Sequence, residues 1–230
     1  MPLLHLPREI RDDIFINVLR SHTGHIHISL GQNSTSATFS LLEVLPSTED
    51  VKGQITLPIL RVSRQIHSEC NNLLWKHNTF FFYPDSLFRD LKYLDIKLAA
   101  KIQHVQLVMD LLSLEKWNEM ALSKLGSWAR SGALKSVTLK LVDPILASVL
   151  HTSSVWTKAI EEKLALLRKV GGESGSLSGV KRRVEINTRL ECALVEYAQR
   201  MSEYKGLDAL LKNVQDAFDG ELWVDGILRT

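Results

Sequence analysis

The chain contains few cysteines, little net charge and no long apolar run. Only Cys70 and Cys192 occur among 230 residues, fewer than a disulfide-stabilised secreted protein uses, so we expect a reducing compartment, the cytoplasm or the nucleus. The formal net charge of +2 is too small to indicate nucleic-acid or membrane binding by itself. No apolar stretch approaches the roughly 20 residues that span a bilayer. Charges interrupt the apolar residues of 1–11, so we expect no signal peptide.

The composition is that of a globular protein, and the N-terminal third predicts helices and strands in alternation. Hydrophobic residues make up 45% and charged residues 23% of the chain, which suits one large domain or two small ones. Apolar spacing distinguishes helices from strands. The expected elements are, in chain order, a helix over 8–20, a strand over 25–30, a strand over 39–44, a polar loop over 47–56, a helix over 57–76 and a buried strand over 79–83.

The C-terminal part predicts strands separated by helices. Such alternation implies right-handed crossovers and a mostly parallel sheet. The expected elements are a helix over 87–98, a strand over 105–109, a helix between Ser113 and Gly132, a strand over 137–141, a helix over 156–167, a strand over 184–186, a helix over 190–218 interrupted near Gly206, and a strand over 222–224. Residues 105–109 and 137–141 should be neighbouring parallel strands, covered by the helix that carries Trp117 and Trp128.

These elements predict an α+β architecture. Residues 1–84 would form a split helical part with an inserted β-hairpin, the insertion covering 21–56. Residues 85–230 would form an irregular βα layer with a mostly parallel sheet, in which the units do not match closely enough to be a repeat. The glycine- and serine-rich stretch 171–179 predicts a mobile loop.

Two separated stretches of the N-terminal third resemble the halves of an F-box. The first half is carried by LPREIR at 6–11, Ile14-Phe15 and Val18-Leu19. The second half is carried by LPILRVSRQIHSE at 57–69, LLW at 73–75 and NTF at 78–80. The pair is similar to a fungal F-box-like family in which such a segment precedes a variable C-terminal region. An ordinary F-box joins its helices by short turns, whereas here the whole of 21–56 intervenes.

The resemblance implies a helical surface that docks onto the Skp-type adaptor of a cullin–RING (SCF-type) ubiquitin ligase, while the C-terminal region selects a target protein. The residues that would bind the adaptor are Leu6, Pro7, Ile10, Ile14, Phe15, Leu60, Val62 and Ile66. The alternative is that the apolar face of the first helix packs against the second helix inside the chain. A stand-alone protein-binding module without a ligase link, or an enzyme of unrecognised type, are the other functions that we consider.

No group of residues has the spacing that catalysis or metal binding requires. His25 and His27 share one face of a predicted strand, but no third zinc ligand is fixed by spacing, so exposed strand polarity is the simpler interpretation. The chain has neither a GxSxG elbow nor a P-loop. Asp110 and Asp143 each follow a strand, where sheet enzymes place carboxylates, although capping of the following loop or helix is the simpler interpretation. We therefore predict a non-enzymatic protein without cofactor or metal.

The remaining candidates for binding also have structural interpretations. The basic run 181–183 lacks an interleaved aromatic platform for nucleic acid and is expected to be a solvated strand entry. Cys70 lies on the apolar face of its helix and is expected to be an inert core thiol. Trp75 and Trp223 are either exposed anchors or packed side chains, and packing is the simpler interpretation.

Overall fold

The computed structural model describes residues 3–30, 39–44, 51–55, 58–83, 101–110, 117–142, 154–172, 175–186, 204–224 and 227–229. The helices are η1 (Leu3–His5), α1 (Arg8–Leu19), η2 (Pro58–Arg61), α2 (Arg64–His77), α5 (Trp117–Arg130), α7 (Ser154–Gly171) and α9 (Tyr204–Phe218). The strands are β1 (His25–Leu30), β2 (Phe39–Val44), β3 (Val51–Gln54), β4 (Thr79–Phe82), β5 (His104–Asp110), β6 (Ser136–Val142), β7 (Lys181–Ile186), β8 (Glu221–Val224) and β9 (Ile227–Arg229).

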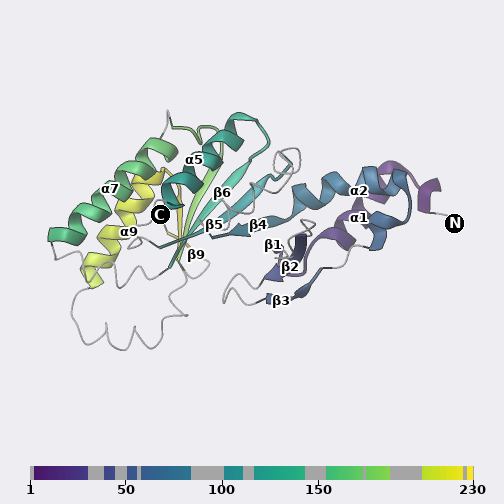
Figure 1. Cartoon of the computed structure of the whole chain (residues 1–230), viewed down its shortest axis with the longest axis horizontal. Helices are drawn as coiled ribbons and strands as arrows, with labels where there is room; N and C mark the ends of the chain where they lie inside the picture. Colours follow the sequence, from purple (N-terminus) through teal and green to yellow (C-terminus); the bar gives the residue numbers. More distant parts are fainter. Residues whose placement is uncertain are drawn as a thin grey trace.

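These strands form one sheet, in the order β3-β2-β1-β4-β5-β6-β7-β8-β9 (Figure 1). The pairs from β1 through β4 to β8 are parallel, whereas β2 and β3 at one edge and β9 at the other are antiparallel. The expectation of a mostly parallel sheet is therefore confirmed. The class is α/β and not α+β, because β1 does not belong to a separate hairpin: it lies between β2 and β4 inside the common sheet.

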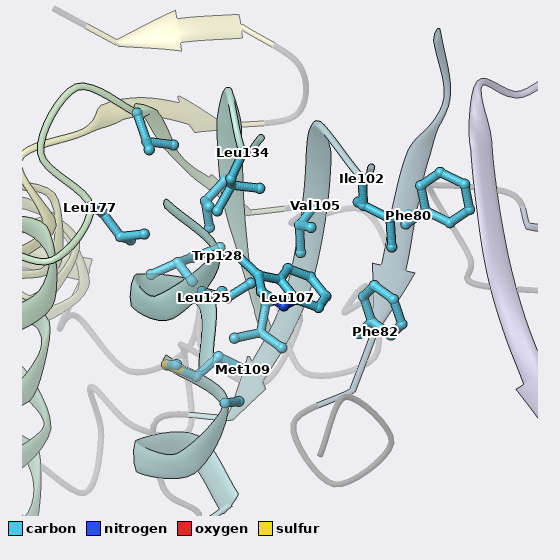
Figure 2. Packing of buried hydrophobic residues seen from close by; sticks show 14 of the residues in the cluster. Phe80, Phe82, Ile102, Val105, Leu107, Met109, Leu125, Trp128, Leu134 and Leu177 are labelled. Atoms are coloured by element: carbon cyan, nitrogen blue, oxygen red, sulfur yellow. The ribbon is translucent and has the colours of Figure 1, made fainter. Parts of the chain in front are cut away.

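The predicted pairing at the centre of the sheet is confirmed. β5 and β6 are parallel neighbours, with Val105 opposite Val137 and Leu107 opposite Leu139. Their alternating apolar side chains are buried on the face that α5 covers, and Figure 2 shows Leu125 and Trp128 of α5 lying against this face. Gly132 ends the region of α5 with a φ of 78°, a conformation that glycine adopts without a steric penalty.

From β4 to β8, neighbouring strands follow one another in chain order. α5, α7 and α9 lie on the same side of the sheet (Figure 1). This follows because every crossover has the same hand and each leads to the next strand in the same direction across the sheet. Each βα unit therefore packs mainly on the preceding and following units, as in a solenoid. Among the helices that the structure describes, none combines the length and the apolar character that crossing a bilayer requires.

The N-terminal third consists of two helix–strand units that lie side by side. α1 leads to β1 and α2 leads to β4, and the two strands pair in parallel. Phe15 of α1 and Cys70 of α2 are fully buried in the shared core. Trp75 stacks on Phe80 with their ring centroids 4.9 Å apart, which joins α2 to the same sheet face that α5 covers. This region is thus integrated into the sheet; the division of the chain at residue 84 stays a prediction.

Two details differ from the prediction for the first 84 residues. The expected helix over 57–76 is divided, because Ser63 caps a new helix by accepting a 3.2 Å hydrogen bond from the Ile66 amide. The expected polar loop over 47–56 contains β3, an edge strand that pairs with β2. An edge strand is held by backbone hydrogen bonds and needs few apolar residues. The polar sequence of β3 therefore lacks the apolar alternation from which a strand is predicted.

The C-terminal region differs in two details and lies partly outside the described residues. α9 continues through Gly206, so the expected interruption there is wrong. The described part of the glycine-rich stretch forms hydrogen-bonded turns around the fully buried Leu177, not an open loop. The expected helix over 87–98, Asp143 and Cys192 lie outside the described residues.

Candidate functional site

The candidate site is an apolar surface on α1 and at the beginnings of α1 and α2. Ile10 and Val18 of α1 are 48% and 53% exposed, and Val62, just before α2, is 67% exposed. Pro7 is exposed and Ile14 is half-buried, so positions 7, 10, 14 and 18 form a stripe at helical spacing along α1. We define the docking surface as this stripe together with the neighbouring apolar residues at the two helix starts: Leu4, Leu6, Pro7, Ile10, Ile14, Val18, Leu60 and Val62.

Two contacts show that α1 and α2 run in the same direction. Near their starts, Arg11 forms an ion pair with Glu69. At their ends, the buried Asn78 side chain donates a 3.0 Å hydrogen bond to the Leu19 carbonyl. The sequence separations are 58 and 59 residues, so α2 follows α1 at a nearly constant offset. The exposed apolar residues before the two helices, Leu4 and Val62, therefore lie at the same end of the helix pair.

The segment before α1 is fixed by Arg11. The Arg11 guanidinium donates to the Leu6 carbonyl at 2.6 Å and to the Leu4 carbonyl at 3.4 Å, besides binding both oxygens of Glu69. The Arg11 hydrogen bond holds the pKa of the Glu69 carboxyl below its ordinary value, against the opposing effect of burial. The Gln65 side chain donates a further 3.1 Å bond to Glu69. A fixed polar network thus holds the apolar residues of the docking surface in place.

The structure divides the eight residues predicted from the resemblance into two groups. Phe15 and Ile66 are 0% and 4% exposed and belong to the core between the helices and the sheet. Their assignment to an adaptor-binding surface is therefore corrected, because a partner reaches neither side chain without unfolding. The other six lie on the docking surface: Leu6, Pro7, Ile10, Ile14, Leu60 and Val62.

Three features of this site were missed from the sequence. Leu4 and Val18 are exposed but were not among the predicted contacts. The helical spacing of positions 7, 10, 14 and 18 could have identified Val18 as part of the site, because Val18 continues the apolar stripe on one side of α1. The Arg11–Glu69 pair joins residues too far apart in the sequence for any helical spacing rule to find it.

The two strand histidines are held by backbone groups. His25 Nδ1 lies 2.9 Å from the Thr23 carbonyl oxygen, and His27 Nδ1 lies 3.2 Å from that of Phe81. Within the described ranges, no three His, Cys, Asp or Glu side chains gather in an arrangement that would hold a metal ion. Each histidine thus has a structural partner, although both side chains are half-buried and not exposed.

Each member of the basic run 181–183 binds a group of its own chain. Lys181 pairs with Glu221 at 3.1 Å, and Arg182 binds both the carboxylate and the carbonyl of Asp219. The Arg183 guanidinium lies 4.1 Å from the centre of the Trp223 ring. These contacts fix the start of β7 beside β8, so the run acts as a structural element of the sheet.

Cys70 and Trp75 are core residues. Cys70 is fully buried, and burial raises the pKa of its thiol from 9.0 to about 11, with the Glu69 charge acting in the same direction. Trp75 is 2% exposed, and its indole nitrogen donates a 2.9 Å hydrogen bond to the Asn71 side chain. Neither residue is available to a partner.

The clearest candidate site among the described residues is therefore this exposed apolar surface. Its apolar side chains have helical spacing, and a buried ion pair fixes the backbone beneath them. Comparison of the chain with protein-family models, with curated proteins and with solved structures found no match.

Proposed function

We propose that the chain is a non-enzymatic protein-interaction adaptor of the cytoplasm or nucleus, which binds a Skp-type partner through the docking surface and recruits a target protein to an SCF-type ubiquitin ligase. One observation carries this proposal. Ile10 and Val62 remain about half exposed or more, although nearby apolar residues such as Phe15 and Ile66 are buried. Exposed apolar side chains that gather on one face are typical of interaction sites.

The geometry of the docking surface suits a partner with an apolar groove. Pro7, Ile10, Ile14 and Val18 follow the spacing with which a helix enters an apolar groove. Arg11 and Glu69 hold the start of α1 against α2, so little ordering is required when a partner binds. Preorganised anchors keep more of their contact energy for affinity.

The C-terminal βα layer would then select the target. Its strands β4 to β8 follow chain order without a reversal, so they do not form the crevice at which open α/β sheets bind small molecules. Stacked βα units offer extended surfaces, which solenoid proteins use for binding other proteins. The target itself stays unidentified.

A second candidate function is a stand-alone protein-binding module without a ligase link. It is favoured by the integration of β1 between β2 and β4, which makes the N-terminal third part of the sheet and not a helical module of its own. The docking surface is the same in both proposals. They differ only in the partner that occupies it.

The decisive experiment measures adaptor binding and folding on the same preparations. We expect Ile10→Glu with Val62→Glu to weaken binding to a purified Skp-type adaptor by about a hundredfold or more, because two anchors of an interface are replaced by charge. The melting temperature should change little, since both positions are exposed. Ser127→Glu, on the exposed side of α5, is the control and should leave binding unchanged.

Each outcome separates the candidates. Lost binding at unchanged melting temperature supports the ligase adaptor. Absence of binding by the parent protein contradicts the ligase proposal and leaves the stand-alone module. A large fall in melting temperature would mean that these residues stabilise the fold, and the docking surface would then not be an interface.

A further inference from the structure

A cluster of basic side chains lies where α1 and α2 end and the parallel strands begin. Its members come from four separate segments of the chain: Arg20, Lys76, His77, His104 and Lys135. The positively charged groups of Arg20, Lys76 and Lys135 all act on His77, and those of His77 and Lys135 act on His104. We call these five residues the basic cluster. It lies at the opposite ends of α1 and α2 from Leu4 and Val62 of the docking surface.

Backbone hydrogen bonds hold these segments side by side. The Gln103 amide donates to the Trp75 carbonyl at 3.4 Å, and the Lys135 amide donates to the Gln103 carbonyl at 2.8 Å. His104 and Ser136 are direct neighbours in the sheet, and His104 Nδ1 lies 2.7 Å from the Ser136 hydroxyl oxygen. The cluster is thus fixed by the regular part of the fold.

Acidic groups do not compensate this charge within the described part of the chain. Arg20, Lys76, His77 and Lys135 are exposed, and none of them forms an ion pair with a described carboxylate. By contrast, Lys181 and Arg182 of the neighbouring strand each have such a partner. Uncompensated cations gathered on one surface produce a positive potential that attracts anions.

A polar hollow adjoins the cluster. Its volume is about 300 Å³, and its lining combines Arg20 and His22 with small polar residues: Asn17, Arg20, Ser21, His22, Thr23 and Gly24. The Ser21 amide at its edge donates to the side chain of Asn78, the residue that follows His77. The hollow therefore lies beside the end of α2, and Arg20 belongs both to its lining and to the basic cluster.

We propose that the basic cluster binds an acidic segment, rich in aspartate or glutamate, of a partner protein. Charge complementarity selects this occupant, since Arg20, Lys76 and Lys135 are exposed, gather around two histidines and form no ion pair with a carboxylate that the structure describes. Nucleic acid fits less well, because the small imidazole rings of His77 and His104 are the only aromatic groups among the five cluster residues, and none of the five is a Phe, Tyr or Trp that would give bases a large stacking platform. The proposal does not depend on the ligase function, because the surface and its occupant are different.

Two histidines make this binding depend on pH. Partial desolvation lowers the pKa of His77, and the charges of Lys76, Arg20 and Lys135 lower it further. The pKa of His104 is lowered first by burial and then by Lys135 and His77, whereas a hydrogen bond with the Lys76 backbone raises it. Both rings are therefore neutral near pH 7. A bound carboxylate favours the protonated rings, so binding takes up protons and strengthens as the pH falls.

The test uses the full-length protein and a fluorescent peptide of about ten aspartates at low salt, where electrostatic binding is strongest. We expect Lys76→Ala with Lys135→Ala to weaken binding by about five- to tenfold, as the loss of two exposed charge contacts implies. Lys124→Ala with Lys169→Ala removes the same charge from α5 and α7 and should change the affinity less than about twofold. Binding should strengthen between about pH 7.5 and 5.5, and His77→Asn should reduce that dependence.

Three results would overturn the proposal. The first is absence of peptide binding by the parent protein at low salt. The second is equal weakening by the two double variants, which would show an effect of net charge alone. The third is tighter, cluster-dependent binding of an oligothymidylate of the same length, which would make nucleic acid the partner.

Discussion

Arg11 and Glu69 form a two-bond ion pair between α1 and α2, with nitrogen–oxygen distances of 2.8 and 3.0 Å across 58 residues of sequence. The same guanidinium also binds the Leu6 carbonyl, so one side chain joins three segments. Only 12% of the Arg11 side chain and 8% of the Glu69 side chain are exposed. The pair therefore determines how the two helices lie against each other.

The first prediction concerns this pair. Arg11→Ala and Glu69→Ala should each lower the melting temperature, because each leaves a largely enclosed charge without its partner. The double variant should lose less than the sum of the two single losses, and the difference measures their coupling. Asp12→Ala, which removes an exposed ion pair with Arg8, is the control and should have a small effect. Additive losses would show that the two side chains act independently.

The second prediction concerns acid. The Arg11 hydrogen bond lowers the pKa of Glu69 in the folded protein below the ordinary value of 4.5. The contribution of Glu69 to stability is therefore complete above about pH 4.5 and is lost as the pH falls through the lower, folded-state pKa. Urea unfolding of the parent and of Glu69→Gln should differ most near neutral pH and converge in acid. A constant difference at every pH would contradict this role.

The third prediction concerns Asn78. Its amide group donates to the carbonyls of Leu19 and Leu74 and accepts from the Ser21 amide, all in a buried position. Asn78→Ala leaves these groups without partners and should lower the free energy of unfolding by about 2–3 kcal/mol, measured by urea titration. Asn72→Ala, on the exposed side of α2, is the matched control. Equal losses of unfolding free energy in the two variants would contradict the role of the buried Asn78 hydrogen bonds.

Comparison of sequence and structure shows why the central strands were predictable and β1 was not correctly placed. Alternating apolar residues around Val105 and Val137 identify two strands, and one intervening helix makes parallel neighbours the natural arrangement. The parallel pairing of Ile26 with Phe80 spans more than fifty residues and leaves no local pattern. The sequence therefore predicts an insertion over 21–56, although this stretch supplies three strands of the common sheet, β1, β2 and β3.

The candidate site was predictable only as a set of apolar positions. Helical spacing identified Ile10 and Phe15 equally, but burial separates them, because only one side of α1 meets the core. The cationic residues His77, His104 and Lys135 lie at or just before strand starts, a signal that becomes visible only when the strand order is known. Tertiary placement, and not residue type, gives these positions their role.

The fourth prediction concerns Gly126 of α5. A Cβ atom at this position would lie 2.3 Å from the Ser176 hydroxyl oxygen and 2.6 Å from its Cβ. Gly126→Ala should therefore lower the free energy of unfolding by about 1–3 kcal/mol, although alanine normally favours a helix. Adding Ser176→Gly should restore most of the loss in thermal unfolding. No rescue would mean that the turns of 175–180 do not pack against α5.

The fifth prediction concerns Cys70, measured in a Cys192→Ser background. The rise of the thiol pKa from 9.0 to about 11 reduces its reactive thiolate about a hundredfold at pH 8, and burial blocks access as well. The folded protein should react with an aromatic disulfide reagent at least about a hundredfold more slowly than the urea-unfolded protein. Equal rates would contradict the core position of this residue.

The place of β1 beside β4 also determines how the chain tolerates shortening. β4 is the strand Thr79–Phe82, with three consecutive buried phenylalanines, and β1 satisfies the backbone groups along one of its sides. A chain that begins after residue 30 would present these phenylalanines on an open sheet edge, which favours pairing with another chain. Such a product would assemble into aggregates or exchanged dimers. The strand order therefore makes the protein prone to aggregation if it is cleaved between β1 and α2 and loses its N-terminal piece.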